Sequence, residues 1–197
     1  MPLRESAPEA VEAAQEAGAA RGPLLLAIAR RSIENGLARG CPRLPDLSSL
    51  PATLQRPGAS FVTLRLQGQL RGCIGSLEVQ APLAQNVAEN AFKAAFRDPR
   101  FEPVRADEFA HVELHVSVLG PLARIEAASE SDLVAQLRPG RDGLVLCEGS
   151  RRATYLPSVW EQVPDPLRFV RELKRKAGLA ADHWSPRVEC YRYGVEE

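Results

Sequence analysis

The sequence predicts an α+β fold in which antiparallel sheets are flanked by helices. Segments with the hydrophobic spacing of helices alternate along the chain with short β-branched or alternating segments that are typical of strands. Two of the strand connections, at residues 67–69 and 148–150, are short enough to be hairpins, and a hairpin pairs its strands antiparallel. A parallel, doubly wound sheet is therefore not expected.

The N-terminal half is expected to hold two helices and three strands. Residues 1–20, rich in Ala and Glu, predict a mobile tail or a marginal helix, and a single domain is expected over residues 21–197. Pro23 suits the first turn of a helix, and four prolines make residues 41–58 an extended loop. The elements expected here are, in order, a helix over 23–39, strands over 60–66 and 70–77, a helix over 81–96 and a strand over 111–119.

The C-terminal half is expected to hold two helices around a hairpin and a closing strand. Ser129 or Ser131 suits the cap of the first helix, and Asp165-Pro166 suits the start of the second, which Gly178 ends. The elements expected here are, in order, a helix over 129–137, strands over 144–147 and 153–156, a helix over 165–177 and a strand over 188–193.

Composition excludes several classes of function. The 25 basic and 25 acidic residues cancel, which removes the general electrostatic attraction to nucleic acid or to an anionic membrane. No apolar run approaches the roughly 20 residues of a membrane span, and the N-terminus has no secretory pattern, so a cytoplasmic location is expected. The four cysteines are scattered, which predicts reduced thiols and not a disulfide framework.

The segment from Leu70 to Leu77 is the most unusual part of the chain. Gly72 and Gly75 lie within an otherwise strand-like run, which predicts a bulge or a closely approached backbone. Between them lies Cys73. Arg71 would favour its thiolate if the two side chains shared a strand face, which a bulge would prevent. The alternative is that Cys73 is a small buried residue of the core.

Three further patterns contain residues that could bind a metal ion, an anion or nucleic acid. His111 and His115 lie about 13 Å apart on one strand, so a shared metal is not expected, and the sequence indicates no cofactor. In Asp98-Pro99-Arg100-Phe101, the proline ends a helix, and Arg100 can pair with Asp98 or Glu102 or bind an external carboxylate or phosphate. The basic run 168–176 is interpreted as a solvated helix face.

The run Leu70-Arg71-Gly72-Cys73-Ile74-Gly75 resembles the hallmark of the AMMECR domain family. The resemblance extends over about residues 22–195 and includes Asn90-Ala91, Asp98-Pro99-Arg100-Phe101 and Glu108. Pro139-Gly140, Asp142-Gly143-Leu144 and Lys174-Arg175-Lys176-Ala177-Gly178 are similar to the bacterial branch, protein A of the AmmeMemoRadiSam system.

This resemblance implies an α+β domain with a larger and a smaller lobe, and it implies partners but no reaction. The expected partners are a Memo-type protein and a radical S-adenosylmethionine enzyme, with a small molecule or peptide as a further ligand. The hallmark is expected to line a functional cleft. The candidate nucleophile is Cys73, and the candidate binding residues are Leu70, Arg71, Gly72, Ile74, Gly75, Glu78, Asn90, Asp98, Arg100 and Glu108.

Three functional hypotheses follow, and whether the protein is an enzyme stays open. The first is a binding or accessory module, because the sequence shows no complete catalytic constellation. The second is an enzyme with Cys73 as nucleophile and Glu78, Glu108 or His183 as its acid or base. The third, nucleic-acid binding, rests on nine basic residues against five acidic ones over 138–176 and is not favoured.

Overall fold

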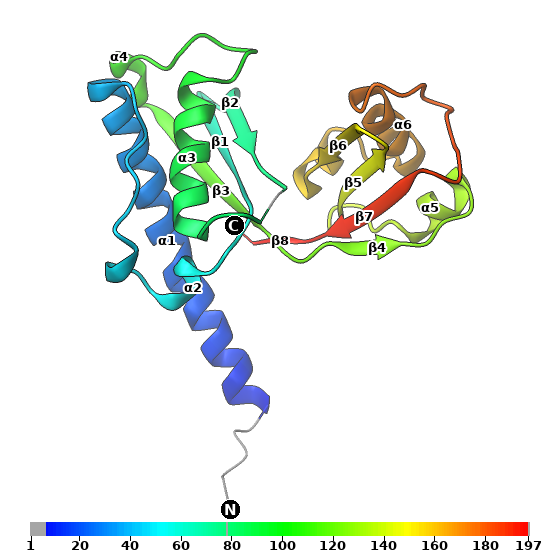
Figure 1. The fold of residues 1–197 in the computed structure, drawn as a ribbon, viewed down its shortest axis with the longest axis horizontal. Helices are drawn as coiled ribbons and strands as arrows, with labels where there is room; N and C mark the ends of the chain where they lie inside the picture. Colours follow the sequence, from blue (N-terminus) through cyan, green and yellow to red (C-terminus); the bar gives the residue numbers. More distant parts are fainter. Residues whose placement is uncertain (1–6, 78, 197) are drawn as a thin grey trace, which may run out of the picture. The chain divides into compact units, whose positions relative to one another are not determined.

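The computed structural model describes residues 7–77 and 79–196, which form two compact units, one up to Val118 and one over residues 119–196 (Figure 1). The first unit contains α1 (Ala7–Arg39), the 3-10 helix η1 (Leu47–Ser49), α2 (Ala52–Gln55), β1 (Ser60–Leu66), β2 (Gln69–Gly75), α3 (Leu83–Phe96), α4 (Ala106–Phe109) and β3 (Val112–Leu119). The second contains β4 (Ala123–Ile125), α5 (Glu130–Gln136), β5 (Gly143–Glu148), β6 (Arg151–Tyr155), the 3-10 helix η2 (Pro157–Glu161), α6 (Pro166–Lys176), β7 (Glu189–Tyr193) and β8 (Val195–Glu196).

The strands form two four-stranded sheets with the orders β2-β1-β3-β8 and β4-β7-β5-β6. The ladders between β1 and β2, β1 and β3, β4 and β7, β5 and β6, and β5 and β7 are all antiparallel. The predicted α+β class with antiparallel sheets is therefore confirmed. Within the described residues, no helix has both the length and the apolar character needed to cross a membrane.

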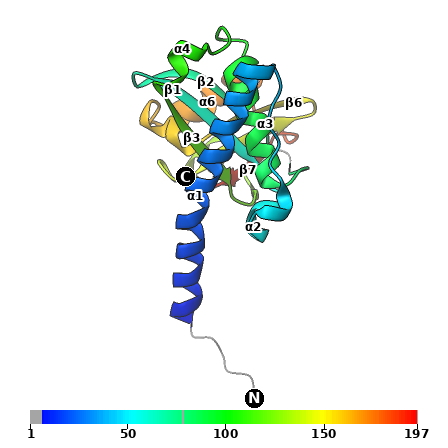
Figure 2. The same cartoon turned by 90° about the vertical axis from the view of Figure 1, so that its left-hand side faces the viewer.

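The core of the first unit lies between its sheet and two helices. Helix α3 packs on β1 and β2, and α1 packs on α3 (Figures 1 and 2). Alternate residues of β1, Val62 and Leu64, are fully buried under these helices, as the period of two in a strand requires. On β3, Val112 and Val116 point into the same core. One face of this sheet is therefore covered by helices, and the opposite face carries the intervening side chains.

Helix α1 is longer than the sequence predicts. It begins at Ala7 and passes through Pro23, which was expected in its first turn. Proline removes one backbone donor, but the surrounding Ala and Glu residues have high intrinsic helix propensity, and the helix continues on both sides. Residues 1–6 lie outside the described residues, so the mobility predicted for residues 1–20 stays a prediction.

The short elements were not predicted. The loop expected over 41–58 contains η1, which Asp46 caps by accepting from the Ser48 N–H at 3.0 Å, and also α2. The sequence likewise predicts no element at α4, η2, β4 or β8. Each spans two to five residues, too few to show the hydrophobic periodicity on which the prediction depends.

The hairpin of β1 and β2 is built on a tight turn followed by a bulge. Gln67 and Gly68 both have positive φ, 53° and 76°, as the two central residues of a type I′ turn require. If the pairing of the two strands continued from the turn without interruption, Cys73 would lie opposite Val62. Instead Arg65 pairs with Leu70 but Leu64 pairs with Gly72, so Arg71 is an extra, bulged residue. This confirms the bulge that the glycines predicted.

Close packing against α3 explains why glycine occupies position 72. A Cβ on Gly72 would lie 2.2 Å from the backbone oxygen of Ala94 in α3, closer than any van der Waals contact allows. Gly75 is also closely approached, by the ring of its cross-strand partner Phe61 on β1. The absence of a side chain therefore lets the backbone of β2 approach α3 at Gly72 and the ring of Phe61 at Gly75.

In the second unit, α6 packs on β6 over a separate core. Phe169 of α6 is fully buried and stacks on Trp160 at a ring-centroid distance of 3.8 Å. The Trp160 indole N–H donates to the Asp142 carbonyl at 2.7 Å, so its polar atom is satisfied within the core. Asp165 caps α6 by accepting from the Arg168 N–H, as the sequence predicts.

We predict that Gly72→Ala lowers the free energy of unfolding by about 2–3 kcal/mol, because the added methyl group must displace β2 from α3. Urea unfolding followed by circular dichroism measures this change. Gly22→Ala is the matched control: it lies in α1 with open space around its Cβ position and is expected to be neutral or slightly stabilising. Equal stability of the two variants would contradict the packing argument.

Candidate functional site

Cys73 lies on the helix-free face of the first unit's sheet. The bulge at Arg71 shifts the register by one residue, so Cys73 pairs with Thr63 and not with the buried Val62. Thr63 in turn pairs with His115 on β3, which gives a cross-strand row of thiol, hydroxyl and imidazole. The Thr63 hydroxyl donates to Cys73 Sγ at 3.3 Å. The thiol is half-buried, so Cys73 is not the fully enclosed core residue that we weighed as the alternative.

The backbone of Cys73 is held from the side opposite β1. Strand β2 is the edge of its sheet, so alternate peptide groups have no partner strand. Asp98 Oδ2 accepts the Cys73 N–H at 2.9 Å, and Arg100 Nη2 donates to the Cys73 carbonyl at 3.1 Å. Asp98 and Arg100 are themselves joined, because Arg100 Nε and Nη2 donate to the two carboxylate oxygens at 2.9 and 2.7 Å. We call this arrangement the Cys73 clamp.

The clamp fixes the charge state of Asp98. The carboxylate is almost fully buried, with 2% of its side chain exposed, and it accepts four hydrogen bonds from Cys73 and Arg100. The Arg100 guanidinium is the main cause that lowers the pKa of Asp98 from 3.8 to about 2, and the Cys73 N–H adds to it against the opposing effect of burial. Asp98 is therefore ionised at neutral pH. Of the partners considered for Arg100 (Asp98, Glu102 or an external anion), the structure shows Asp98.

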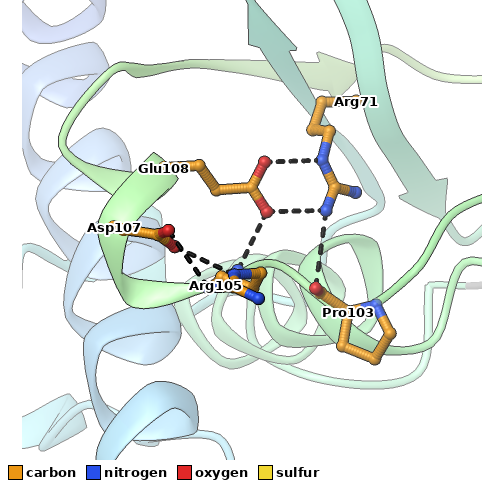
Figure 3. Close-up of polar contacts among 5 residues, drawn as sticks. All are labelled: Arg71, Pro103, Arg105, Asp107 and Glu108. Atoms are coloured by element: carbon orange, nitrogen blue, oxygen red, sulfur yellow. Dashed lines mark hydrogen bonds and ion pairs between the residues drawn. The ribbon is translucent and has the colours of Figure 1, made fainter.

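A second ion pair holds the segment that follows the clamp. The Arg71 guanidinium binds Glu108 of α4 with two hydrogen bonds of 3.0 and 2.7 Å, and it also donates to the Pro103 carbonyl (Figure 3). Glu108 Oε1 further accepts the Arg105 N–H at the start of α4. The hydrogen bonds from Arg71 lower the pKa of Glu108. Arg71 is thus engaged with Glu108 and does not share the row of Cys73.

The other predicted motif residues lie around this edge. Leu70 is exposed, whereas Ile74 packs against the core beneath the sheet. Asn90 is buried on α3, where its Nδ2 donates to the Ser60 carbonyl at 3.0 Å and holds the start of β1. Asn90 is therefore on the core side of the sheet and not on the face of Cys73. Glu78 lies outside the described residues.

The acids and bases proposed from the sequence have other partners. Glu108 is bound to Arg71, and His183 belongs to the second unit, where its Nε2 lies 2.9 Å from Glu148 Oε2. Thr63 is not predicted as a site residue from the sequence, and the spacing of His115 from His111 raises only the question of a shared metal. Both become visible once the cross-strand register is known, and that register depends on the position of the bulge.

The basic run on α6 is largely neutralised. Lys174 was counted as part of an exposed face, but it is fully buried and paired with Glu130 of α5. Arg171 also pairs with Glu130, at 3.3 Å, and Arg168 lies 3.4 Å from Glu172 on the same helix. The two pairs with Glu130 hold α6 to α5, and together with the pair inside α6 they leave fewer unpaired charges for nucleic acid than the sequence suggested.

Possible metal ligands are also dispersed in the part of the chain that the structure describes. No three His, Cys, Asp or Glu side chains there gather in an arrangement that suits a metal ion. His115 lies on β3 and His111 precedes that strand. The chemistry available around Cys73 is therefore that of a thiol, a hydroxyl and an imidazole along one sheet face.

The fold and this edge define a two-unit α+β protein with a clamped cysteine on a sheet edge, and comparison with known proteins identifies its family. The family model AMMECR1 matches residues 26–197, so the chain belongs to the AMMECR1 family. It is 40% identical over 179 residues to a protein of Methanothermobacter thermautotrophicus, covering 89% of this chain and 92% of that protein. A protein of Thermotoga maritima is 38% identical over 168 residues, with 84% and 91% coverage.

A solved structure supports the fold. The crystal structure of the uncharacterized protein PH0010 from Pyrococcus horikoshii superposes with a TM-score of 0.82 at 32% identity and covers 88% of each chain. The family predicted from the hallmark residues and the fold that it implied are therefore confirmed.

The clamp predicts a pH-dependent contribution to stability. Because folding lowers the pKa of Asp98, the folded state gains about 2 kcal/mol above pH 4, and this gain is lost as the pH falls toward 2. Asp98→Asn is therefore expected to lower the free energy of unfolding by about 2 kcal/mol at pH 7, and the difference from the natural chain is expected to narrow below pH 4.

Urea unfolding of both proteins at pH 7, 5, 4 and 3 measures this difference. Asp107→Asn is the control, because Asp107 pairs with Arg105 on an exposed surface, and it is expected to have a much smaller effect. A constant difference between Asp98→Asn and the natural chain at every pH would show that the ionised clamp is not its source.

Proposed function

We propose that this protein is a binding component of a multi-protein system and that the sheet face around Cys73 is its ligand-binding surface. The ligand is a small molecule or a peptide, which contacts the half-buried Cys73 and Thr63 and the exposed His115. The hallmark segment 70–75 would form one wall of this surface.

The observation that carries this proposal is the Cys73 clamp. Both polar groups of the Cys73 backbone are held by an ion pair whose carboxylate is buried, while the thiol accepts a hydrogen bond from a hydroxyl that is not a strong base. Such an arrangement fixes the position of the side chain without activating it by an adjacent acid or base. A preorganised surface lowers the entropic cost of binding, which is what a recognition module requires.

A second candidate function is an enzyme that uses Cys73 as a nucleophile. The row on the sheet face favours it, because an imidazole two strands away completes a thiol, hydroxyl and histidine set. Adjacent strands lie about 4.8 Å apart, so the backbones of Cys73 and His115 are separated by roughly 10 Å. Proton transfer would then pass through the Thr63 hydroxyl or through the ligand itself.

The proposed system is that of the bacterial branch, in which this chain is protein A beside a Memo-type protein and a radical S-adenosylmethionine enzyme in the cytoplasm. The support is the pattern of residues in the second unit, Pro139-Gly140, Asp142-Gly143-Leu144 and Lys174–Gly178. In this proposal the chain supplies the binding surface, and the partners supply the metal and radical chemistry.

The rate at which Cys73 is alkylated in the native protein distinguishes a binding module from an enzyme with a cysteine nucleophile. Cys41 is exposed, Cys73 is half-buried and Cys190 is buried, so Cys41 and Cys190 serve as internal references for a fast and a slow alkylation rate. For the module, iodoacetamide is expected to modify Cys73 more slowly than Cys41 and faster than Cys190, whose pKa burial raises to about 12. Peptide mass spectrometry over a time course at pH 7 measures the three rates.

Two outcomes would contradict this assignment. Modification of Cys73 faster than Cys41, slowed by His115→Ala but not by His111→Ala, would support the nucleophile. Protection of Cys73 equal to that of Cys190 would show that the thiol does not reach a binding surface at all.

Association with the two partners is tested separately. Co-expression of the chain with the Memo-type protein and the radical enzyme is expected to yield at least one complex that elutes as a single species in size-exclusion chromatography. Independent elution of all three proteins at tens of micromolar would overturn the proposed assembly, but it would leave the ligand-binding surface to be decided by alkylation.

A further inference from the structure

A cavity lies on the helical side of the first unit, away from the helix-free sheet face that carries Cys73. Its volume is about 310 Å³, within the range of small-molecule sites. It opens between α1 and the chain that follows this helix, which runs back along α1 toward α2 (Figure 1). The side chains that matter for its chemistry are Ile28, Arg31, Arg43, Leu44, Asp46 and Leu50.

The return of the chain along α1 is fixed by buried and specific hydrogen bonds. Ser32 is fully buried on α1 and its hydroxyl accepts the Arg43 N–H at 3.3 Å, while it donates to the Ala88 carbonyl of α3. Asn35 Nδ2 donates to the Cys41 carbonyl at 2.8 Å. Arg31 and Arg43 are 12 positions apart in sequence, but these contacts bring them to one cavity.

The two arginines have no charged partner in the part of the chain that the structure describes. Neither the Arg31 nor the Arg43 side chain forms a hydrogen bond or an ion pair with a described residue. The nearby carboxylate of Asp46 accepts from the Ser48 N–H and hydroxyl at 3.0 and 2.8 Å and is used as the cap of η1. Elsewhere in this unit, Arg71, Arg100 and Arg105 each pair with a carboxylate.

The floor of the cavity is apolar. Ile28 is 7% exposed and Leu50 packs against the core of the unit, whereas Leu44 is 50% exposed at the rim. Leu44 and the two guanidinium groups thus place an apolar contact beside positive charge, which suits a ligand that carries both an apolar group and an anionic one. Guanidinium groups bind carboxylates and phosphates with two parallel hydrogen bonds.

We propose that this cavity binds a small organic anion whose carboxylate or phosphate contacts Arg31 and Arg43 and whose apolar body lies on Ile28, Leu44 and Leu50. The site shares no residue with the Cys73 surface, so it is independent of the function proposed there.

Hexyl phosphate, hexanoate and hexanol are the probes, because they share one apolar chain and differ in the head group. Titration of the full-length, ¹⁵N-labelled protein by NMR is expected to shift the signals of residues 28–31 and 43–50 with the two anions, with Kd on the order of 1 mM. The better of the two anions distinguishes a phosphate site from a carboxylate site. Hexanol is expected to bind at least about tenfold more weakly, since it cannot pair with the arginines.

Charge variants test the role of the arginines. Arg31→Gln combined with Arg43→Gln is expected to weaken anion binding at least about tenfold and to leave hexanol unchanged. Asp46→Asn keeps the helix cap, removes the one negative charge and is expected to strengthen anion binding about two- to threefold. Arg39→Gln is the matched control, because this arginine ends α1 but does not line the cavity.

Three results would overturn the proposal. One is the absence of shifts in these residues with either anion. Another is hexanol binding as tightly as hexyl phosphate. The third is an equal loss of affinity in Arg39→Gln and in the double variant, which would indicate general charge attraction and not a site.

Discussion

The structure around the hallmark residues depends on one extra residue in β2. The bulge at Arg71 reverses which side chains of the following strand face the core, because the side-chain period of a strand is two. Cys73 then faces away from the helices, and Gly72 comes against α3, where the Ala94 carbonyl leaves no room for a Cβ. Without the bulge, Cys73 would lie opposite Val62 in the core, and no thiol would be available on the outer face.

A bulge at a sheet edge also leaves backbone N–H and carbonyl groups without a hydrogen-bond partner on a neighbouring strand. This explains why the hallmark segment 70–75 and the distant segment 98–108 lie together. The unpaired N–H and carbonyl of Cys73 meet Asp98 and Arg100, and the displaced Arg71 meets Glu108. The segment over 98–108 is thus attached to β2 at both of its ends. An ion pair with a buried carboxylate is stable only when its hydrogen bonds are complete, so this edge tolerates little change of geometry.

The long elements could be predicted from the sequence, but the register could not. Apolar spacing located α3, β3 and α6 to within a few residues, and the capping residue Asp165 was correct. The glycines predicted a bulge, but its position at Arg71 is set by the contact of Gly72 with α3, which is not visible in local sequence. For the same reason, the partner of Arg100 stayed open, and Thr63 was not recognised as a neighbour of Cys73.

The first unit therefore places different chemistry on its two sides, and its layers explain why. Helices α1 and α3 cover one face of the sheet, so the outer face can hold a thiol, a hydroxyl and an imidazole on a rigid backbone. The far side of the helical layer carries the cavity with Arg31 and Arg43, whose charges have no partner within the described chain. Arg71 and Arg100 complete the edge of the sheet, whereas in our proposal Arg31 on α1 and Arg43 in the loop after it bind an anion. Two such charges beside an apolar floor match the chemistry of a small organic anion, because a guanidinium binds a carboxylate or phosphate with two parallel hydrogen bonds while the floor accepts the apolar body.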